Sequence, residues 1–121
     1  MPSSFKDLRV WQEAMRFAMN VYRATAQFPR HELYGLSQQL RRAAVSVPSN
    51  IAEDKGHRSN REFRNFSLHA RGSLLEVQTQ LMIVQELQYI SQEEGKHLLG
   101  LSDAIARSLN CLINSMSETA A

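Results

Sequence analysis

A chain of 121 residues, 43% of them hydrophobic, is long enough to form one domain around a single core. Few glycines and prolines, and the lack of any strand-like alternation of apolar residues, exclude an all-β fold and predict an all-α protein. The 14 basic and 12 acidic residues nearly balance, so the distribution of charge along the chain is more informative than its net charge of +2.

The single cysteine, Cys111, excludes a disulfide framework or a paired-cysteine zinc site within one chain. Its apolar helical context predicts a small buried side chain in a reduced compartment. The first residues carry no apolar signal core, and no apolar run approaches the roughly 18 residues that a membrane span requires. We therefore expect a soluble cytoplasmic protein with no membrane partner.

The first half of the chain predicts two amphipathic helices. The first is expected over residues 8–27, because Phe28-Pro29 disfavours further helix. The second is expected over residues 32–55, with the Glu32 carboxylate at the positive end of the helix dipole. Pro48 removes a backbone donor inside this second helix and predicts a kink near residues 44–48.

The second half predicts two further helices, each opened by a capping box. Ser59 to Glu62 begins a helix over residues 60–89, and Ser91 to Glu94 begins one over residues 92–116. Gly72 inside the third helix costs up to about 1 kcal/mol relative to alanine, which predicts close approach by another helix. Four such helices with short connections predict one antiparallel up-down-up-down bundle over residues 1–121.

Two of these helices carry a second apolar stripe. In the first helix we expect the stripe from Leu8 through Trp11, Met15 and Tyr22 to face the bundle, whereas a stripe through Val10 lies about 110° around the helix. A monomeric bundle needs one stripe per helix, so the second stripes predict a homo-oligomer. The predicted interface residues are Val10, Phe17, Val21, Leu68, Leu75 and Met82. The alternative is that the stripes are merely wide.

Charge is unevenly distributed along the chain. Residues 41–71 hold seven basic and three acidic side chains, whereas residues 72–121 hold two basic and six acidic ones. This asymmetry predicts a phosphate-binding surface. Its candidate residues are Arg41, Arg42, Arg58, Arg61, Arg64 and Arg71. The alternative is a solvated helix end in which these arginines pair with carboxylates of the same chain.

No motif predicts catalysis, a metal or another cofactor. The four histidines lack the spacing of metal ligands, and no glycine-rich loop follows a strand. Ser46, Ser49, Asn50 and Glu53 gather near Pro48, where we interpret them as polar side chains that satisfy an interrupted helix rather than as a hydrolytic cluster.

Several segments together resemble the 23S rRNA-intervening-sequence protein family. They are Phe5-Lys6-Asp7-Leu8, Val10-Trp11-Gln12, Phe28-Pro29, Glu32-Leu33-Tyr34-Gly35-Leu36, Gln39-Leu40-Arg41-Arg42-Ala43-Ala44, Ser46-Val47-Pro48-Ser49-Asn50-Ile51-Ala52-Glu53, Glu62-Phe63, Ala70-Arg71-Gly72-Ser73-Leu74-Leu75-Glu76 and Leu87-Gln88-Tyr89. The resemblance covers nearly all of the chain. Asp54 departs from it, because the family commonly has glycine there.

The resemblance implies a four-helix bundle that assembles into a ring-like homopentamer, similar to accessory proteins of diversity-generating retroelements. Those proteins use a basic surface to engage nucleic acid and a reverse transcriptase, and the resemblance supplies no catalytic residue. We therefore expect a non-enzymatic homo-oligomeric scaffold that binds nucleic acid weakly and with little sequence preference, with structured RNA as the first expectation and DNA as the alternative. The alternative function is a protein-interaction module that does not bind nucleic acid.

Overall fold

The structure, a computed structural model, describes residues 4–55 and 60–117 and contains no strand within them. Short 3-10 helices precede the first two α-helices. The elements are η1 (Phe5–Asp7), α1 (Arg9–Thr25), η2 (Arg30–Glu32), α2 (Leu36–Lys55), α3 (Asn60–Glu86) and α4 (Gln92–Ser117). The predicted all-α bundle is confirmed. The expected cap at Gly56 and the capping serine Ser59 lie outside the described residues.

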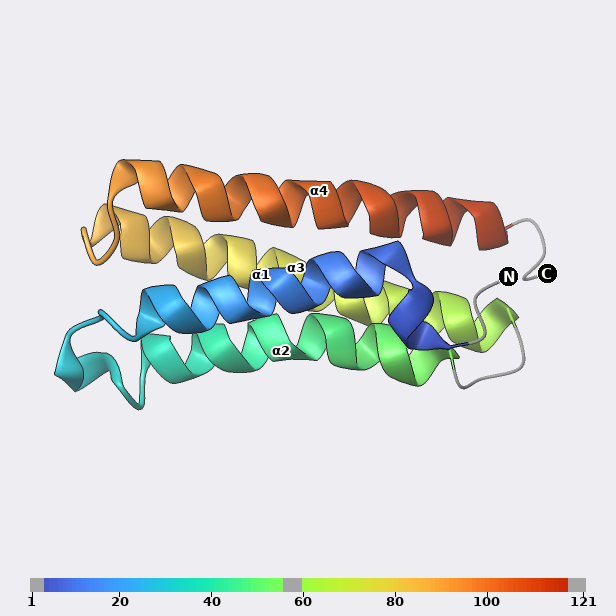
Figure 1. Cartoon of the computed structure of the whole chain (residues 1–121), viewed down its shortest axis with the longest axis horizontal. Coiled ribbons are helices and arrows are strands. Elements are labelled where there is room, and N and C mark those ends of the chain that lie inside the picture. The colour runs from blue at the N-terminus through green and yellow to red at the C-terminus, as the bar shows by residue number, and fades with distance from the viewer. Residues whose placement is uncertain (1–3, 56–59, 118–121) are drawn as a thin grey trace.

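Consecutive helices run in opposite directions (Figure 1). Hydrogen bonds between side chains give the same order, because α2 and α3 are joined by Gln39 with Gln80 and by Ser46 with Ser73. Residue numbers therefore increase along one helix in the direction in which they decrease along the other, so the two helices are antiparallel. Within the described residues α1 contacts α2 and α4, and α3 contacts the same two helices, so the four helices form a closed square.

One hydrophobic core lies between the four helices. Its fully buried members come from every helix and include Phe17, Leu40, Leu74 and Ile105. Small residues pack among them, and Ala14, for example, has no exposed surface. Burying side chains of this size is the main favourable contribution to folding.

The predicted orientation of α1 is wrong. The stripe through Val10, Phe17 and Val21 is buried in the core, whereas Met15 and Tyr22 on the other stripe are exposed. Val10, Phe17 and Val21 therefore cannot meet a second copy while the bundle stays folded. Their assignment to an oligomer interface is corrected here.

Helix boundaries differ from expectation at two chain reversals. Helix α2 begins at Leu36 rather than near Glu32, because η2 and a turn come first, and Leu36 then donates its N–H to the Glu32 carboxylate. Helix α3 ends at Glu86 rather than near Tyr89. There Gln88 adopts φ 62°, and the N–H of Tyr89 donates to the carbonyl of Val84. This pattern matches a Schellman C-terminal cap.

Replacing Gln88 with glycine is expected to raise the free energy of unfolding by about 0.5–1 kcal/mol, because glycine adopts a positive φ without steric cost. Thermal or urea unfolding measures the change. Gln85→Gly, inside α3, is the control and is expected to destabilise by a similar amount, since glycine weakens a helix interior. A loss of stability at both positions would contradict the strain assigned to Gln88.

Pro48 lies within α2, which continues through it to Lys55. Beside it, the Asn50 side-chain amide donates to both the carbonyl and the hydroxyl oxygen of Ser46. The Ser46 hydroxyl is also 2.7 Å from that of Ser73 on α3. These bonds join the polar side chains to α2 itself and to α3.

Gly72 does not pack against another helix within the described residues. A Cβ atom built on Gly72 would meet no atom of another helix within 4 Å, so the expected close approach is not found there. Packing inside the described chain therefore does not explain this glycine.

Candidate functional site

The six predicted phosphate-binding arginines do not gather into one patch. Arg42 is exposed on α2 and precedes Lys55 by 13 positions, which places it about 20 Å from the end of that helix. Arg61 and Arg64 lie in the first turns of α3, near that far end. Arg58 lies outside the described residues.

Two of the predicted arginines are held by contacts inside the chain. The Arg41 guanidinium donates from Nε to the Thr25 hydroxyl at 2.7 Å and lies 4.8 Å from the centre of the Tyr22 ring. Arg71 donates to the Asn110 side-chain oxygen at 2.9 Å. Both side chains therefore join neighbouring helices, and each has fewer donors left for a ligand.

Helix α1 presents a straight row of basic side chains that the sequence interpretation missed. Arg9, Arg16 and Arg23, which we call the arginine row, are exposed and stand seven residues apart, or about 10.5 Å along the helix. Arg9 lies 4.0 Å from the Glu13 carboxylate, whereas Arg16 and Arg23 have no ion pair among the described residues. The heptad spacing of these arginines is visible in the sequence, so the signal was available.

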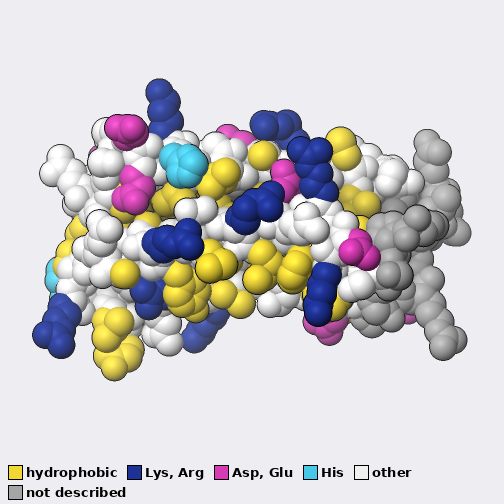
Figure 2. Space-filling view, in the orientation of Figure 1, with side chains coloured by type: hydrophobic (Ala, Val, Ile, Leu, Met, Phe, Trp, Pro, Cys, Tyr) yellow, Lys and Arg dark blue, Asp and Glu magenta, His cyan; other side chains and the backbone are white. Residues whose placement is uncertain are grey.

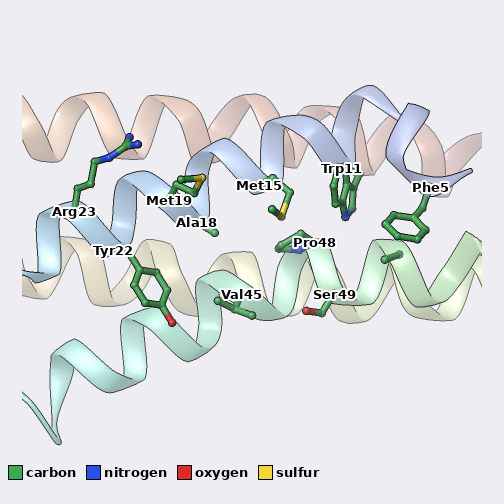
Figure 3. Close-up of a pocket in the computed structure, with 11 residues that line it drawn as sticks. Phe5, Trp11, Met15, Ala18, Met19, Tyr22, Arg23, Val45, Pro48 and Ser49 are labelled. Atoms are coloured by element: carbon green, nitrogen blue, oxygen red, sulfur yellow. The ribbon is translucent and has the colours of Figure 1, made fainter.

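An apolar groove runs between α1 and α2 beside this row. Figure 3 shows Trp11, Met15 and Tyr22 descending from α1 toward α2, with Pro48 on the opposite side. The groove encloses about 620 Å³. We call it the α1–α2 groove, and its lining residues are Phe5, Trp11, Met15, Ala18, Met19, Tyr22, Arg23, Val45, Pro48, Ser49 and Ala52. Figure 2 shows hydrophobic side chains gathered along this face among basic ones.

The other predicted interface residues lie on α3. Leu75 and Met82 are 56% and 54% exposed, and Leu68 is half-buried. Since the three repeat every seven residues, they form one line along the helix, which we call the α3 ridge. The predicted interface is thus split between a buried part on α1 and an accessible part on α3.

A polar contact joins the two chain reversals at one end of the bundle. The Tyr89 hydroxyl donates to the Glu32 carboxylate at 2.9 Å. Hydrogen bonds from the Leu36 N–H and from Tyr89 lower the pKa of Glu32, and the bond to Glu32 raises the pKa of Tyr89. The contact joins η2 to the end of α3. With these shifts Glu32 is ionised and Tyr89 is protonated near neutral pH, which suits a structural hydrogen bond and not a general base.

One sequence expectation about a reactive side chain is overturned. Cys111 is exposed, so the expectation of a small buried side chain is wrong. Across residues 4–55 and 60–117, no three histidine, cysteine, aspartate or glutamate side chains are arranged to hold a metal ion. No helix of the described part is long and apolar enough to cross a membrane.

These features define a small four-helix bundle protein with a basic row, an apolar groove and an exposed ridge. The chain belongs to the 23S rRNA-intervening sequence protein family, whose sequence model matches residues 6–111. The predicted family is therefore confirmed.

A solved structure has the same fold. It is a protein of unknown function from the S23 ribosomal protein family of Bacteroides thetaiotaomicron, with a TM-score of 0.78 and 22% sequence identity over 86% of this chain and 97% of that one. No curated protein matches the sequence. At this identity the likeness establishes the fold.

Proposed function

We propose that the protein is a non-enzymatic, homo-oligomeric scaffold that binds nucleic acid, and RNA in the first place, weakly and with little sequence preference. The observation that carries the proposal is the arginine row on α1. Exposed guanidinium groups attract a polyanion and release its counterions, and Arg16 and Arg23 have no ion pair among the described residues. Because Arg23 also lines the groove, Arg9 and Arg16 are assigned as the phosphate contacts on α1.

Two of the arginines predicted from the sequence support the same function. Arg42 and Arg61 are exposed and have no ion pair among the described residues. Arg42 also borders a hollow of about 350 Å³ together with Tyr34, an aromatic residue that is 85% exposed. A cation beside an accessible aromatic ring suits phosphate binding with base stacking.

Reversing two charges on α1 is expected to weaken RNA binding three- to tenfold and to reduce the salt dependence by about two phosphate contacts. The variant is Arg9→Glu with Arg16→Glu, and labelled structured RNA is titrated at several salt concentrations. Duplex DNA in parallel tests the preference for RNA. The matched control is Lys96→Glu with Arg107→Glu, which reverses two exposed charges on α4.

Unchanged RNA affinity in the α1 variant, in protein that is folded by circular dichroism, would remove the assigned contacts. A wild-type protein that binds neither RNA nor DNA at low salt would remove the nucleic-acid function altogether. The α1–α2 groove would then favour the second candidate, a protein-interaction module. That module would retain its partners through nuclease treatment and high salt.

A further inference from the structure

The hollow of about 350 Å³ beside Tyr34 has a different chemistry from the α1–α2 groove. The groove is lined almost entirely by apolar side chains, whereas aromatic, amide and guanidinium groups line the hollow together. We call it the Tyr34 hollow, and its lining residues are Tyr22, Leu33, Tyr34, Gln38, Arg41 and Arg42. Its volume is at the lower end of the roughly 300–1,000 Å³ of ligand pockets, which suits one small ring system.

Tyr34 is the most accessible side chain of the hollow. It is 85% exposed and makes no hydrogen bond or ring contact within the described residues. An aromatic ring with an accessible face is a platform on which a nucleobase stacks. A single exposed aromatic residue is ordinary on a protein surface, so the groups beside this ring decide what it binds.

The turn that carries Tyr34 is held by hydrogen bonds on both sides. The Gly35 N–H donates to the Glu32 carbonyl at 2.9 Å. One oxygen of the Glu32 carboxylate accepts from the Leu36 N–H, and the other accepts from the Tyr89 hydroxyl. Because the backbone below the ring is already fixed, less freedom is lost when a base stacks on the ring, and this favours binding.

A second aromatic ring forms one wall of the hollow and is fixed by Arg41. The Arg41 guanidinium carbon lies 4.8 Å from the centre of the Tyr22 ring, and its Nε donates to the Thr25 hydroxyl at 2.7 Å. These contacts hold the ring and the cation against each other. The hollow therefore has one aromatic wall and one positive charge whose positions are set before any ligand arrives.

Two polar side chains of α2 complete the hollow. Gln38 and Arg42 are four residues apart, which places them on one face of the helix and about 6 Å apart along its axis. Both are exposed, and neither makes a hydrogen bond within the described residues. The Gln38 amide offers a donor and an acceptor, which match the edge of a base, whereas the Arg42 guanidinium matches a phosphate.

The charge around the hollow also favours a phosphate. No carboxylate among the described residues lines it, and the nearest one along the chain, that of Glu32, has both oxygens occupied by donors. Tyr22 lines both the hollow and the α1–α2 groove, so the hollow opens beside Arg23 at the end of the arginine row. A strand with one base in the hollow can therefore continue along the basic side of α1.

These groups select a nucleotide that is not base-paired. A base inside a duplex is stacked on its neighbours and uses its edge for pairing, so it reaches Tyr34 and Gln38 only if it is turned out of the helix. Loops, bulges and ends present bases without that cost. A surface that attracts phosphates alone has no such preference, because a duplex carries the higher density of charge.

We propose that the Tyr34 hollow binds one unpaired nucleotide, with the base on the Tyr34 ring, its edge at Gln38 and its phosphate at Arg42. The protein then prefers single-stranded ends and loops to continuous duplex. The inference rests on the nucleic-acid binding of the proposed function and names the form of nucleic acid that this site takes. RNA and DNA share the base and the phosphate, so the site accepts a nucleotide of either.

A duplex with a short single-stranded overhang tests the hollow in three versions. One version has a normal overhang, one has an overhang of abasic sugars with the same phosphates, and one has no overhang. By fluorescence anisotropy, the wild type is expected to bind the normal overhang roughly five- to twentyfold more tightly than the abasic one, as is typical of one base stacked on an aromatic ring. The preference is expected in an RNA set and in a DNA set measured in parallel.

Substitutions of Tyr34 separate the base from the phosphates. Tyr34→Ala is expected to remove the preference for the normal overhang and to bind the abasic one within about twofold of the wild type, because the phosphate contacts remain. Tyr34→Phe keeps the ring and is expected to keep the preference. The matched control is Leu87→Ala, which truncates another exposed apolar side chain near the chain reversal that contacts Glu32, and it is expected to behave as the wild type.

Substitution of Arg42 tests the phosphate contact separately. Arg42→Gln is expected to weaken binding of the normal and abasic overhangs equally, by roughly two- to fivefold, and to lower the salt dependence by about one phosphate contact. Arg107→Gln, which removes one exposed charge from α4, is the control and is expected to change neither. A loss confined to the normal overhang would overturn the assignment of Arg42 to the phosphate.

The other outcomes distinguish this site from the proposed function. Equal wild-type affinity for the normal and abasic overhangs, or a folded Tyr34→Ala variant that keeps the preference, would overturn the hollow as a base site and leave nucleic-acid binding intact. No binding to any version at low salt would overturn both. Free adenosine monophosphate is expected to compete only at far higher concentration than the strand. Competition at equal concentration would make a free nucleotide, not a strand, the ligand of the hollow.

Discussion

Replacing Phe17 with alanine is expected to lower the free energy of unfolding by about 3–5 kcal/mol, the usual cost of removing a large aromatic side chain from a core. Phe17 has no exposed surface and comes from the α1 stripe that packs against the other helices. The loss is a large share of the roughly 5–15 kcal/mol that stabilises a typical domain.

Urea unfolding at several protein concentrations measures this effect. Met19→Ala is the matched control, because Met19 lies two residues away on the same helix and is 52% exposed. Its loss is expected to stay within about 0.5 kcal/mol in the monomer. If Phe17 contacted a second copy instead, Phe17→Ala would change the mass of the assembly and have little effect on the unfolding of the monomer.

The sequence predicted the bundle because its apolar periodicity is strong on every helix. The expected stripes on α2, α3 and α4 do reach the core, as Leu40, Leu74 and Ile105 illustrate. The fold follows from this periodicity alone, since four amphipathic helices with short connections have few other ways to bury their apolar faces.

Periodicity could not decide which stripe of α1 faces inward. Both stripes repeat at three- and four-residue steps, and the one with Trp11, Met15 and Tyr22 is the larger and more aromatic. The stripe that is buried includes Ala14, which lets neighbouring helices approach closely. The fit of side-chain size against the neighbouring helices decides the orientation, and the sequence of one helix alone does not contain that information.

The arginines show a related limit. Proximity in sequence suggested one basic patch, but about 20 Å of helix separates Arg42 from the end where Arg61 lies. Arg41 carries the same charge as Arg42 and lies beside it in the sequence, but its guanidinium donates to the Thr25 hydroxyl across the α1–α2 contact. The charge asymmetry over residues 41–71 does not include the arginine row on α1, although the seven-residue spacing of Arg9, Arg16 and Arg23 is present in the sequence.

Replacing Gln80 with methionine is expected to raise the free energy of unfolding by about 1–2 kcal/mol. Gln80 is only 7% exposed, and its side-chain oxygen is buried without a hydrogen-bond partner in the described structure. Its amide nitrogen makes two long contacts, 3.4 Å to Gln39 and 3.3 Å to Glu76. A buried acceptor without a partner costs about 1–3 kcal/mol, which methionine of similar shape removes.

Gln78→Met is the matched control, two residues away on α3. The Gln78 amide donates to the Ser102 hydroxyl at 2.9 Å and to the Asp103 carboxylate at 3.0 Å, so its replacement is expected to cost about 0.5–1.5 kcal/mol. The sequence does not distinguish these two glutamines, but their replacement by methionine should change the free energy of unfolding, measured in urea, in opposite directions. A loss of stability in both variants would mean that the Gln80 oxygen is satisfied in solution, because methionine would then remove a hydrogen bond rather than an unpaired acceptor.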